Sequence, residues 1–226
     1  MTEAEYSRSL IWLRGEIDSA LRIYHISEEM NQLALSDKDV YRHLNDEAGF
    51  WLVNSGCLQT SLFIILGRIF DTDPSANSIR TVIRNTVNHV EFFSEEALRL
   101  RKSGLSSEDL ETYMEDVWIP TKEALQRLKP GVAKYQKVFD KKYAPLRNKV
   151  YAHSEFSDEH AYPLFTETKK NEVEEMLIYL LVVTDGIIAL YNNGREPSLE
   201  VSYRDGRYSF IRDSVGRVLR PRVIGL

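Results

Sequence analysis

The residues best suited to chemistry lie in one short stretch, "PLRNKVYAHSE", which runs from Pro145 to Glu155. It places Arg147, Asn148 and His153 close together in the chain. A neutral histidine can take the proton from a ribose 2′-OH or give one to a departing 5′-oxygen. An arginine can hold the phosphate through two hydrogen bonds and stabilise the charge that builds up on it. With an asparagine to orient either group, these side chains could cleave an RNA phosphodiester without a metal ion.

The spacing within this stretch sets a geometric condition. Arg147 and His153 are six positions apart, so on an ideal helix they point about 120° away from each other. Either the long arginine swings round, or two copies of the helix meet at a two-fold axis and share one cleft. Pro145 suits the first turn of a helix, where free N–H groups and the helix dipole favour an anion near Arg147.

The arginine–histidine spacing is a weak pattern by itself. About one such match is expected by chance in a chain of this composition. A second match is present in "RNTVNH", with Arg84, Asn85 and His89. Spacing alone does not choose between the two stretches, although a structural or surface role is the simpler expectation for His89.

Charge is distributed unevenly along the chain. The net charge of −5 gives no general attraction to nucleic acid. From Lys129 to Lys149, however, Asp140 is the one acid among many basic residues, and the residues after Asn192 are rich in arginine. A phosphate-binding surface needs only such local patches, so Lys142 and Lys149 are candidate contacts to the RNA backbone. Lysines on a solvated helix face are equally common without any ligand.

Metal, cofactor and disulfide chemistry find little support in the sequence. The one cysteine, Cys57, lies in an apolar stretch, where we expect a buried and inert thiol. No Cys/His group has metal-ligand spacing, and no Gly-rich phosphate loop is present. The acids of "DTD" at Asp71–Asp73 are explained better by a helix-capping loop than by a divalent ion. We therefore expect no metal and no cofactor.

The apolar stretches Phe50–Phe70 and Met176–Tyr191 are candidates for membrane spans. Polar residues interrupt the first, and the second is short and carries Asp185. Both are interpreted as buried core helices. The polar, acidic N-terminus does not have the pattern of a signal peptide, and a cytoplasmic protein without membrane contact is expected.

Apolar periodicity predicts helices along most of the chain. An amphipathic helix covers the N-terminal region and ends or bends at Leu35–Asp39. A second runs from about Asn45 to Phe70, and Asp73 before Pro74 predicts the start of a third. The last long helix is expected at Lys169–Asn192. Between the third helix and this last one, a further helix is expected to begin with Ser106 or Ser107 as its cap.

The C-terminal region has a different pattern. "SLEVSYRDGRYSFIR" alternates apolar and polar residues on both sides of Asp205-Gly206, which predicts a β-hairpin. The hairpin either covers one end of the bundle or contributes basic side chains to a substrate surface, namely Arg204, Arg207 or Arg212. The expected fold is thus an all-α, up-and-down helical bundle over residues 1–192, followed by a small β-hairpin and a basic tail over 193–226.

The motif and its surroundings resemble the HEPN superfamily. The stretch "LRNKVYAHSE" follows a lysine-rich helix and precedes an acidic loop and a long apolar helix, as in that superfamily. Upstream, "LGRIFDTDPSANSIRTVI" is similar to the branch associated with phage abortive infection. The resemblance implies an up-and-down helical core reaching to about Asn192 and a homodimer with the motif helices at its interface. Many members are metal-independent endoribonucleases of toxin–antitoxin, antiphage or RNA-processing systems.

The resemblance also assigns residues. It places the family motif on Arg147, Asn148 and His153, and not on Arg84 and His89. In one subgroup a tyrosine two residues after the histidine is modified by a partner nucleotidyltransferase. Here that position is Glu155, so this regulation is not expected.

Two functions of different classes follow. The first is an endoribonuclease that leaves a 2′,3′-cyclic phosphate and a 5′-OH, with an antitoxin protein as its natural partner. The second is a non-catalytic dimeric module that binds a nucleotide or a partner protein.

Overall fold

The computed structural model describes residues 1–148, 169–200 and 208–220. Within these residues the chain is helical and contains no strand. The α-helices are α1 (Glu3–Ser36), α2 (Lys38–Asp46), α3 (Ala48–Ile69), α4 (Ile79–Asn88), α5 (Glu95–Arg101), α6 (Ser107–Met114), α7 (Lys122–Gln126), α8 (Lys129–Val138), α9 (Ala144–Leu146), α11 (Lys170–Asn193) and α12 (Ser209–Leu219). A 3₁₀ turn, η1 (Val90–Phe93), follows α4, and a π-helical turn, η2 (Phe139–Tyr143), joins α8 to α9.

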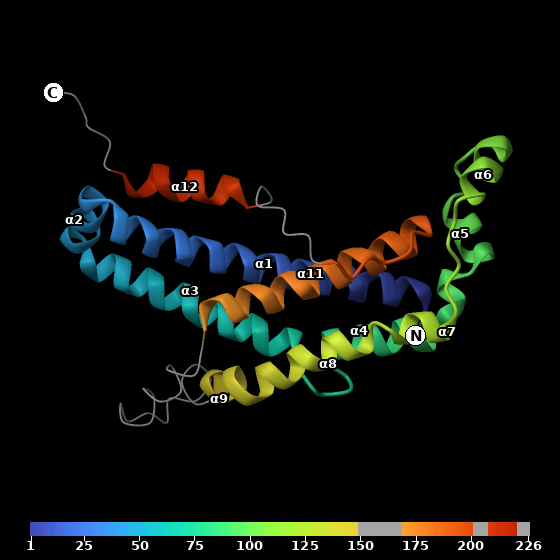
Figure 1. The fold of residues 1–226 in the computed structure, drawn as a ribbon, viewed down its shortest axis with the longest axis horizontal. Coiled ribbons are helices and arrows are strands. Elements are labelled where there is room, and N and C mark those ends of the chain that lie inside the picture. Colours follow the sequence, from blue (N-terminus) through green and yellow to red (C-terminus); the bar gives the residue numbers. More distant parts are fainter. Residues whose placement is uncertain (149–168, 201–207, 221–226) are drawn as a thin grey trace.

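Helix α1 is the spine of the fold, and the other long helices lie along it (Figure 1). Its 34 residues begin at a capping box in which the Thr2 hydroxyl accepts from the Glu5 N–H and the Glu5 carboxylate accepts from the Thr2 N–H. A fully buried stripe at steps of three and four faces α3 and α11, which accounts for the predicted amphipathic pattern. The members of that stripe are Tyr6, Leu10, Leu13, Ile17 and Leu21.

The break after α1 lies where the sequence predicts it. The backbone of Asp37 is extended, and its carboxylate accepts hydrogen bonds from the N–H groups of Asp39 and Val40, which starts α2. Ser106 caps α6 in the same way, as expected. The third long element starts later than predicted, at Ile79 with Ser78 as its cap. The reason is that the Asp73 carboxylate bonds the N–H and hydroxyl of Ser75, which closes a local turn instead of a helix.

Helix α3 confirms the predicted helix, but only half of it is a core helix. Its C-terminal half contributes buried side chains such as Leu66 and Ile69. In its N-terminal half, Phe50, Leu52 and Val53 are exposed. By length and composition α3 is able to cross a membrane. Only 17% of its most apolar 18-residue segment is buried inside the protein, so it is not packed like a core helix. The expectation of a wholly buried helix is therefore wrong.

Cys57 lies in this N-terminal half of α3 and is exposed. The expectation of a buried thiol is therefore wrong, and it fails for the same reason as the expectation of a wholly buried helix. Apolar neighbours in the sequence show that a helix can be buried, but not that a partner element covers it.

The predicted β-hairpin is not seen in the part of the chain that the structure describes. Its proposed turn, Asp205-Gly206, lies outside the described residues, but its second strand is helix α12. The apolar residues Ile211, Val215 and Leu219 recur every four positions, so they share one face of the helix, and this face is buried against α1. Helix α12 thereby joins the same core as α1 (Figure 1).

Candidate functional site

Arg147 and Asn148 follow a rod formed by α8, η2 and α9. In η2 the N–H of Ala144 donates to the carbonyl of Phe139, a five-residue step that turns the chain more slowly than an α-helix. Phe139 anchors the turn by stacking on Phe70 at the end of α3, with ring centroids 4.9 Å apart. Such π-turns are frequent at functional sites, because they aim a side chain that a regular helix would place elsewhere.

The side chain of Arg147 lies across Gly67 of α3. A Cβ atom at Gly67 would stand 2.7 Å from Arg147 Nε and 3.3 Å from its Cζ, so a side chain here would force the guanidinium to move. The buried Nε has no hydrogen-bond partner among the described residues. Arg147 Nη1 donates to Asn148 Oδ1 at 2.8 Å. The guanidinium is thus held between a helix backbone and the amide of its neighbour, and Asn148 is exposed at the surface.

Glu172, at the start of α11, joins the two chain ends that flank residues 149–168. Its Oε1 lies 2.6 Å from Lys142 Nζ, and its Oε2 lies 2.8 Å from the hydroxyl of Tyr143. That hydroxyl is also 3.2 Å from the carbonyl of Lys169, and its one proton can go to either acceptor. This cluster of Lys142, Tyr143, Lys169 and Glu172 ties the end of η2 to the start of α11.

The electrostatics of this cluster follow from its burial. Burial raises the pKa of Tyr143, and the neighbouring Glu172 carboxylate raises it further. Burial alone would raise the pKa of Glu172 too, but the hydrogen bonds from Lys142 and Tyr143 outweigh it and lower that pKa below its ordinary value. Lys142, a predicted phosphate contact, is therefore engaged by a charged carboxylate.

The remaining candidates of the motif, Lys149 and His153, lie outside the described residues. The structure thus brings Arg147 and Asn148 together. His153 is five residues beyond Asn148 in the chain, a length that spans at most about 17 Å when fully extended.

In the second arginine–histidine match, Arg84 and His89 each make local structural contacts. Arg84 Nη2 donates to the carbonyl of Pro74 at 3.1 Å, which fastens the loop before α4. His89 Nδ1 lies 2.9 Å from Glu91 Oε1, and its ring stacks on Phe92 with centroids 4.9 Å apart. The contacts of His89 tie the end of α4 to η1.

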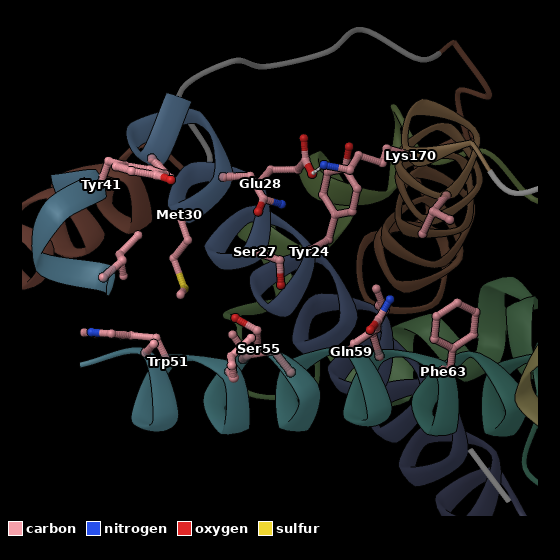
Figure 2. A pocket seen from close by; sticks show the side chains of 18 of the residues that line it. Tyr24, Ser27, Glu28, Met30, Tyr41, Trp51, Ser55, Gln59, Phe63 and Lys170 are labelled. Atoms are coloured by element: carbon pink, nitrogen blue, oxygen red, sulfur yellow. Dashed lines mark ion pairs between the residues drawn. The ribbon is translucent and has the colours of Figure 1, made fainter. Parts of the chain in front are cut away.

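A groove of about 610 Å³ opens beside the candidate site, between α1, α2 and α3 (Figure 2). Its walls are mostly apolar and aromatic, and Tyr24, Trp51 and Phe63 face into it. An ion pair between Glu28 and Lys170, with 2.7 Å between Oε1 and Nζ, lies at its rim. Tyr143 and Lys169 line the end nearest Arg147. Sequence reasoning missed this groove, because the same apolar pattern fits a helix packed on all sides.

Metal ligands do not gather in the described part of the chain. Among residues 1–148, 169–200 and 208–220, no group of three or more His, Cys, Asp and Glu side chains is placed to hold a metal ion. Asp71 and Asp73 instead accept backbone N–H groups of their own loop.

The helical core described above agrees with the all-α fold that the sequence predicts. The family model HEPN_AbiU2, described as AbiU2, matches residues 3–215. The chain therefore belongs to this family, an abortive-infection-like branch of the HEPN superfamily. The match extends into α12, beyond the region in which the sequence itself shows the resemblance. No curated protein and no solved structure matches the chain.

Proposed function

We propose that the protein is a metal-independent endoribonuclease that serves in a toxin–antitoxin or antiphage defence system. The observation that carries this proposal is the position of the Arg147 side chain. Its guanidinium lies over Gly67, which has no side chain, and donates a hydrogen bond to the exposed Asn148. An arginine held in this way can bind a phosphate without first losing the freedom of a long side chain. Membership of the HEPN superfamily supports the same reading.

In this proposal each motif residue has one role. His153 takes the proton from the 2′-OH or gives one to the 5′-oxygen. The 2′-oxygen attacks the phosphorus, the bond to the 5′-oxygen breaks, and the products carry a 2′,3′-cyclic phosphate and a 5′-OH. Arg147 binds the phosphate and stabilises the charge in the transition state, and Asn148 orients the guanidinium. Lys149 adds positive charge, whereas Lys142 reaches RNA only by leaving Glu172.

The proposal includes a homodimer through the motif helix, because two copies can place an arginine and a histidine on opposite sides of one phosphate. It also includes a cytoplasmic location, RNA as the substrate and an antitoxin protein as the partner.

The test is cleavage of total cellular RNA by purified protein in EDTA. Wild type is compared with His153→Ala and Arg147→Gln. The second match in the sequence supplies matched controls, His89→Ala and Arg84→Gln. We expect the wild type and both controls to cut, and the two motif variants to lose roughly 100-fold or more. End-group analysis should then show the cyclic phosphate. Equal cleavage by wild type and His153→Ala would rule the proposal out.

The ion pair of Lys142 with Glu172 favours a second candidate, a non-catalytic dimeric module that binds a nucleotide or a partner protein. A carboxylate this close to the candidate site reduces the positive charge that RNA would meet. Absence of cleavage by a folded wild-type dimer would support this candidate.

A further inference from the structure

The groove between α1, α2 and α3 is lined by polar side chains that the fold itself does not use. Ser27 and Asn45 donate hydrogen bonds to carbonyls of their own helices. The side chains of Asn31, Ser55 and Gln59 also line the groove, and within the described ranges none of the three is hydrogen-bonded to another residue. Figure 2 shows Ser55 and Gln59 pointing from α3 into the groove. A few uncharged polar groups in an apolar pocket are typical of a small-molecule site.

The floor of the groove is aromatic at one end. Tyr24 of α1 and Phe63 of α3 are each only 6% exposed, so they lie at the bottom of the groove rather than at its rim. Trp51 lines the opposite end (Figure 2). The volume of about 610 Å³ lies within the range of ligand pockets. An aromatic floor below uncharged polar groups fits a flat ring system that carries donors and acceptors at its edge.

The groove leads to the candidate site along a single row of α3. At steps of four residues this row consists of Ser55, Gln59, Phe63 and Gly67. The first three line the groove, and the side chain of Arg147 lies across the fourth. From Gly67 to Gln59 the helix rises about 12 Å, which is comparable to the length of one nucleotide from its phosphate to the outer edge of its base. A nucleotide with its phosphate on Arg147 can therefore place its base in the groove.

The two ends of the groove differ in charge. Lys169 lines the end near Arg147, where the ion pair of Lys170 with Glu28 adds no net charge. At the opposite end, the acidic Glu47 precedes the first residue of α3. An anionic phosphate is therefore favoured at the Arg147 end and disfavoured at the other, which sets the direction in which a nucleotide lies.

The amide of Gln59 distinguishes between bases. It carries one donor and one acceptor side by side, which match the N6–H and N7 of adenine through two hydrogen bonds. Guanine presents two acceptors, O6 and N7, on the same edge, so the amide satisfies only one of them. A pyrimidine also matches an amide, but it offers a smaller apolar surface to the aromatic floor. Adenine is therefore the base that fits this groove.

We propose that this groove binds the adenine base of a nucleotide, with the phosphate at the Arg147 end. The nucleotide is either part of an RNA or free, and both present the same chemistry. Gln59 bonds the edge of the base, and Asn31 and Ser55 offer further hydrogen bonds. A partner helix fits less well, because its apolar face would leave these polar groups without partners. That the bound phosphate is the one cleaved rests on the proposed function, whereas the base site itself does not.

The first test measures binding of the full chain to 2′-fluoro RNA hexamers by fluorescence anisotropy. The fluorine replaces the attacking hydroxyl, so the probes stay intact. The hexamers are all uracil, or carry one adenine or one guanine in place of a uracil. We expect the adenine probe to bind about 10-fold more tightly than the other two.

Gln59→Leu should abolish this preference for adenine. The matched control, Gln126→Leu, changes an exposed glutamine of α7 that does not line the groove, and it should keep the preference. Equal binding of the three probes by the wild type, or an unchanged preference in Gln59→Leu, would overturn the proposal. A wild type that binds none of the probes would also overturn it and leave the groove to a partner protein.

The second test fills the groove. Ser55→Trp places an indole on its α3 wall, whereas Ser61→Trp places one on the same helix outside the lining. Both serines are exposed, so the fold should tolerate either change, and circular dichroism checks this. We expect Ser55→Trp to lose the adenine preference and Ser61→Trp to keep it. The same loss in both variants, or a loss in Ser61→Trp alone, would place the base elsewhere and overturn the proposal.

Competition with AMP separates the two sources of the nucleotide. Displacement of the adenine probe by AMP at concentrations near the Kd of the probe itself would assign the groove to a free nucleotide. Displacement only at far higher concentrations would assign it to RNA. Adenine preference without cleavage of RNA by the wild type would keep the base site and remove the nuclease. Cleavage of RNA without any base preference would keep the nuclease and remove the base site.

Discussion

Arg147 packs so closely on Gly67 that a methyl group at Gly67 would meet its Nε at 2.7 Å. The two residues lie far apart in the sequence, and each occupies a position that the other restricts. The contact links α3 to the end of the α8–α9 rod through a single flexible side chain. Changing Gly67 should therefore move the arginine without breaking the core.

The first prediction concerns this contact. Gly67→Ala should displace the guanidinium of Arg147 and lower RNA cleavage about 10-fold, because positioning errors of this size are costly in catalysis. The fold should survive, since the displaced group is the end of a long side chain. The control is Gly15→Ala, at an open position on α1, which should leave cleavage unchanged. Initial rates and circular dichroism of both variants check the result, and a Gly67→Ala variant that keeps full activity would contradict it.

The second prediction concerns the pH dependence of stability. The folded pKa of Glu172 is lowered, so its contribution is fully present above the ordinary glutamate pKa and is lost as the pH falls through the folded value. Glu172→Gln should cost about 1–2 kcal/mol at neutral pH by removing the charge-assisted bond to Lys142. The difference from wild type should shrink in acid.

Urea unfolding across a pH series measures that difference. Glu111→Gln serves as the control, because Glu111 forms an exposed ion pair with Arg99 and should have a much smaller effect. A Glu172→Gln difference that does not change with pH would show that the ion pair is not the cause.

The third prediction concerns a buried hydrogen bond between α1 and α4. The Thr86 hydroxyl donates to the carbonyl of Val82 at 2.9 Å, so at 2.8 Å it must accept from the hydroxyl of Tyr6. Tyr6→Phe leaves Thr86 satisfied and should cost about 1 kcal/mol. Thr86→Val leaves the Tyr6 hydroxyl buried without an acceptor and should cost more, about 1–3 kcal/mol. Urea denaturation gives the order, and the reverse order would refute the assigned direction of the bond.

The fourth prediction tests helix α12. Leu219 is buried against α1, while its neighbour Val218 is exposed. Leu219→Ala should lower the free energy of unfolding by about 2–3 kcal/mol, whereas Val218→Ala should change it little. Thermal and urea unfolding of the two variants measure this difference. Similar losses in both would mean that α12 does not pack on α1.

The sequence predicts local features of this fold well. The break at Asp37, the cap at Ser106 and the long helices follow from capping chemistry and from a period of three to four residues, which act over short distances. The hairpin prediction failed because Asp205-Gly206 is a strong local signal, whereas the spacing of Ile211 and Leu219 matters only once α1 is there to bury them.

In the candidate site, too, the sequence predicts the local features but not the contacts between distant residues. The adjacency of Arg147 and Asn148 is visible in the sequence, but their contacts with α3 and α11 are not. Neither the seat on Gly67 nor the pairing of Lys142 with Glu172 has a local signature. A glycine inside α3 does not provide that signature either, because a Cβ atom at Gly49 or Gly56 would meet nothing within 4 Å, and Gly67 alone of the three lies against Arg147.

The π-turn of η2 has a consequence for how such a site can change in evolution. A turn that holds one more residue than an α-helical turn is equivalent to a one-residue insertion between Phe139 and Tyr143. If the same residues closed as a regular α-helix, Arg147 would rotate by up to about 100° and leave Gly67. The bonds of Lys142 and Tyr143 to Glu172 of α11 would be disturbed by the same rotation. A single-codon insertion or deletion in this turn can therefore place Arg147 on Gly67 or remove it from there. Such a change would hardly alter the overall sequence identity between two members of the family.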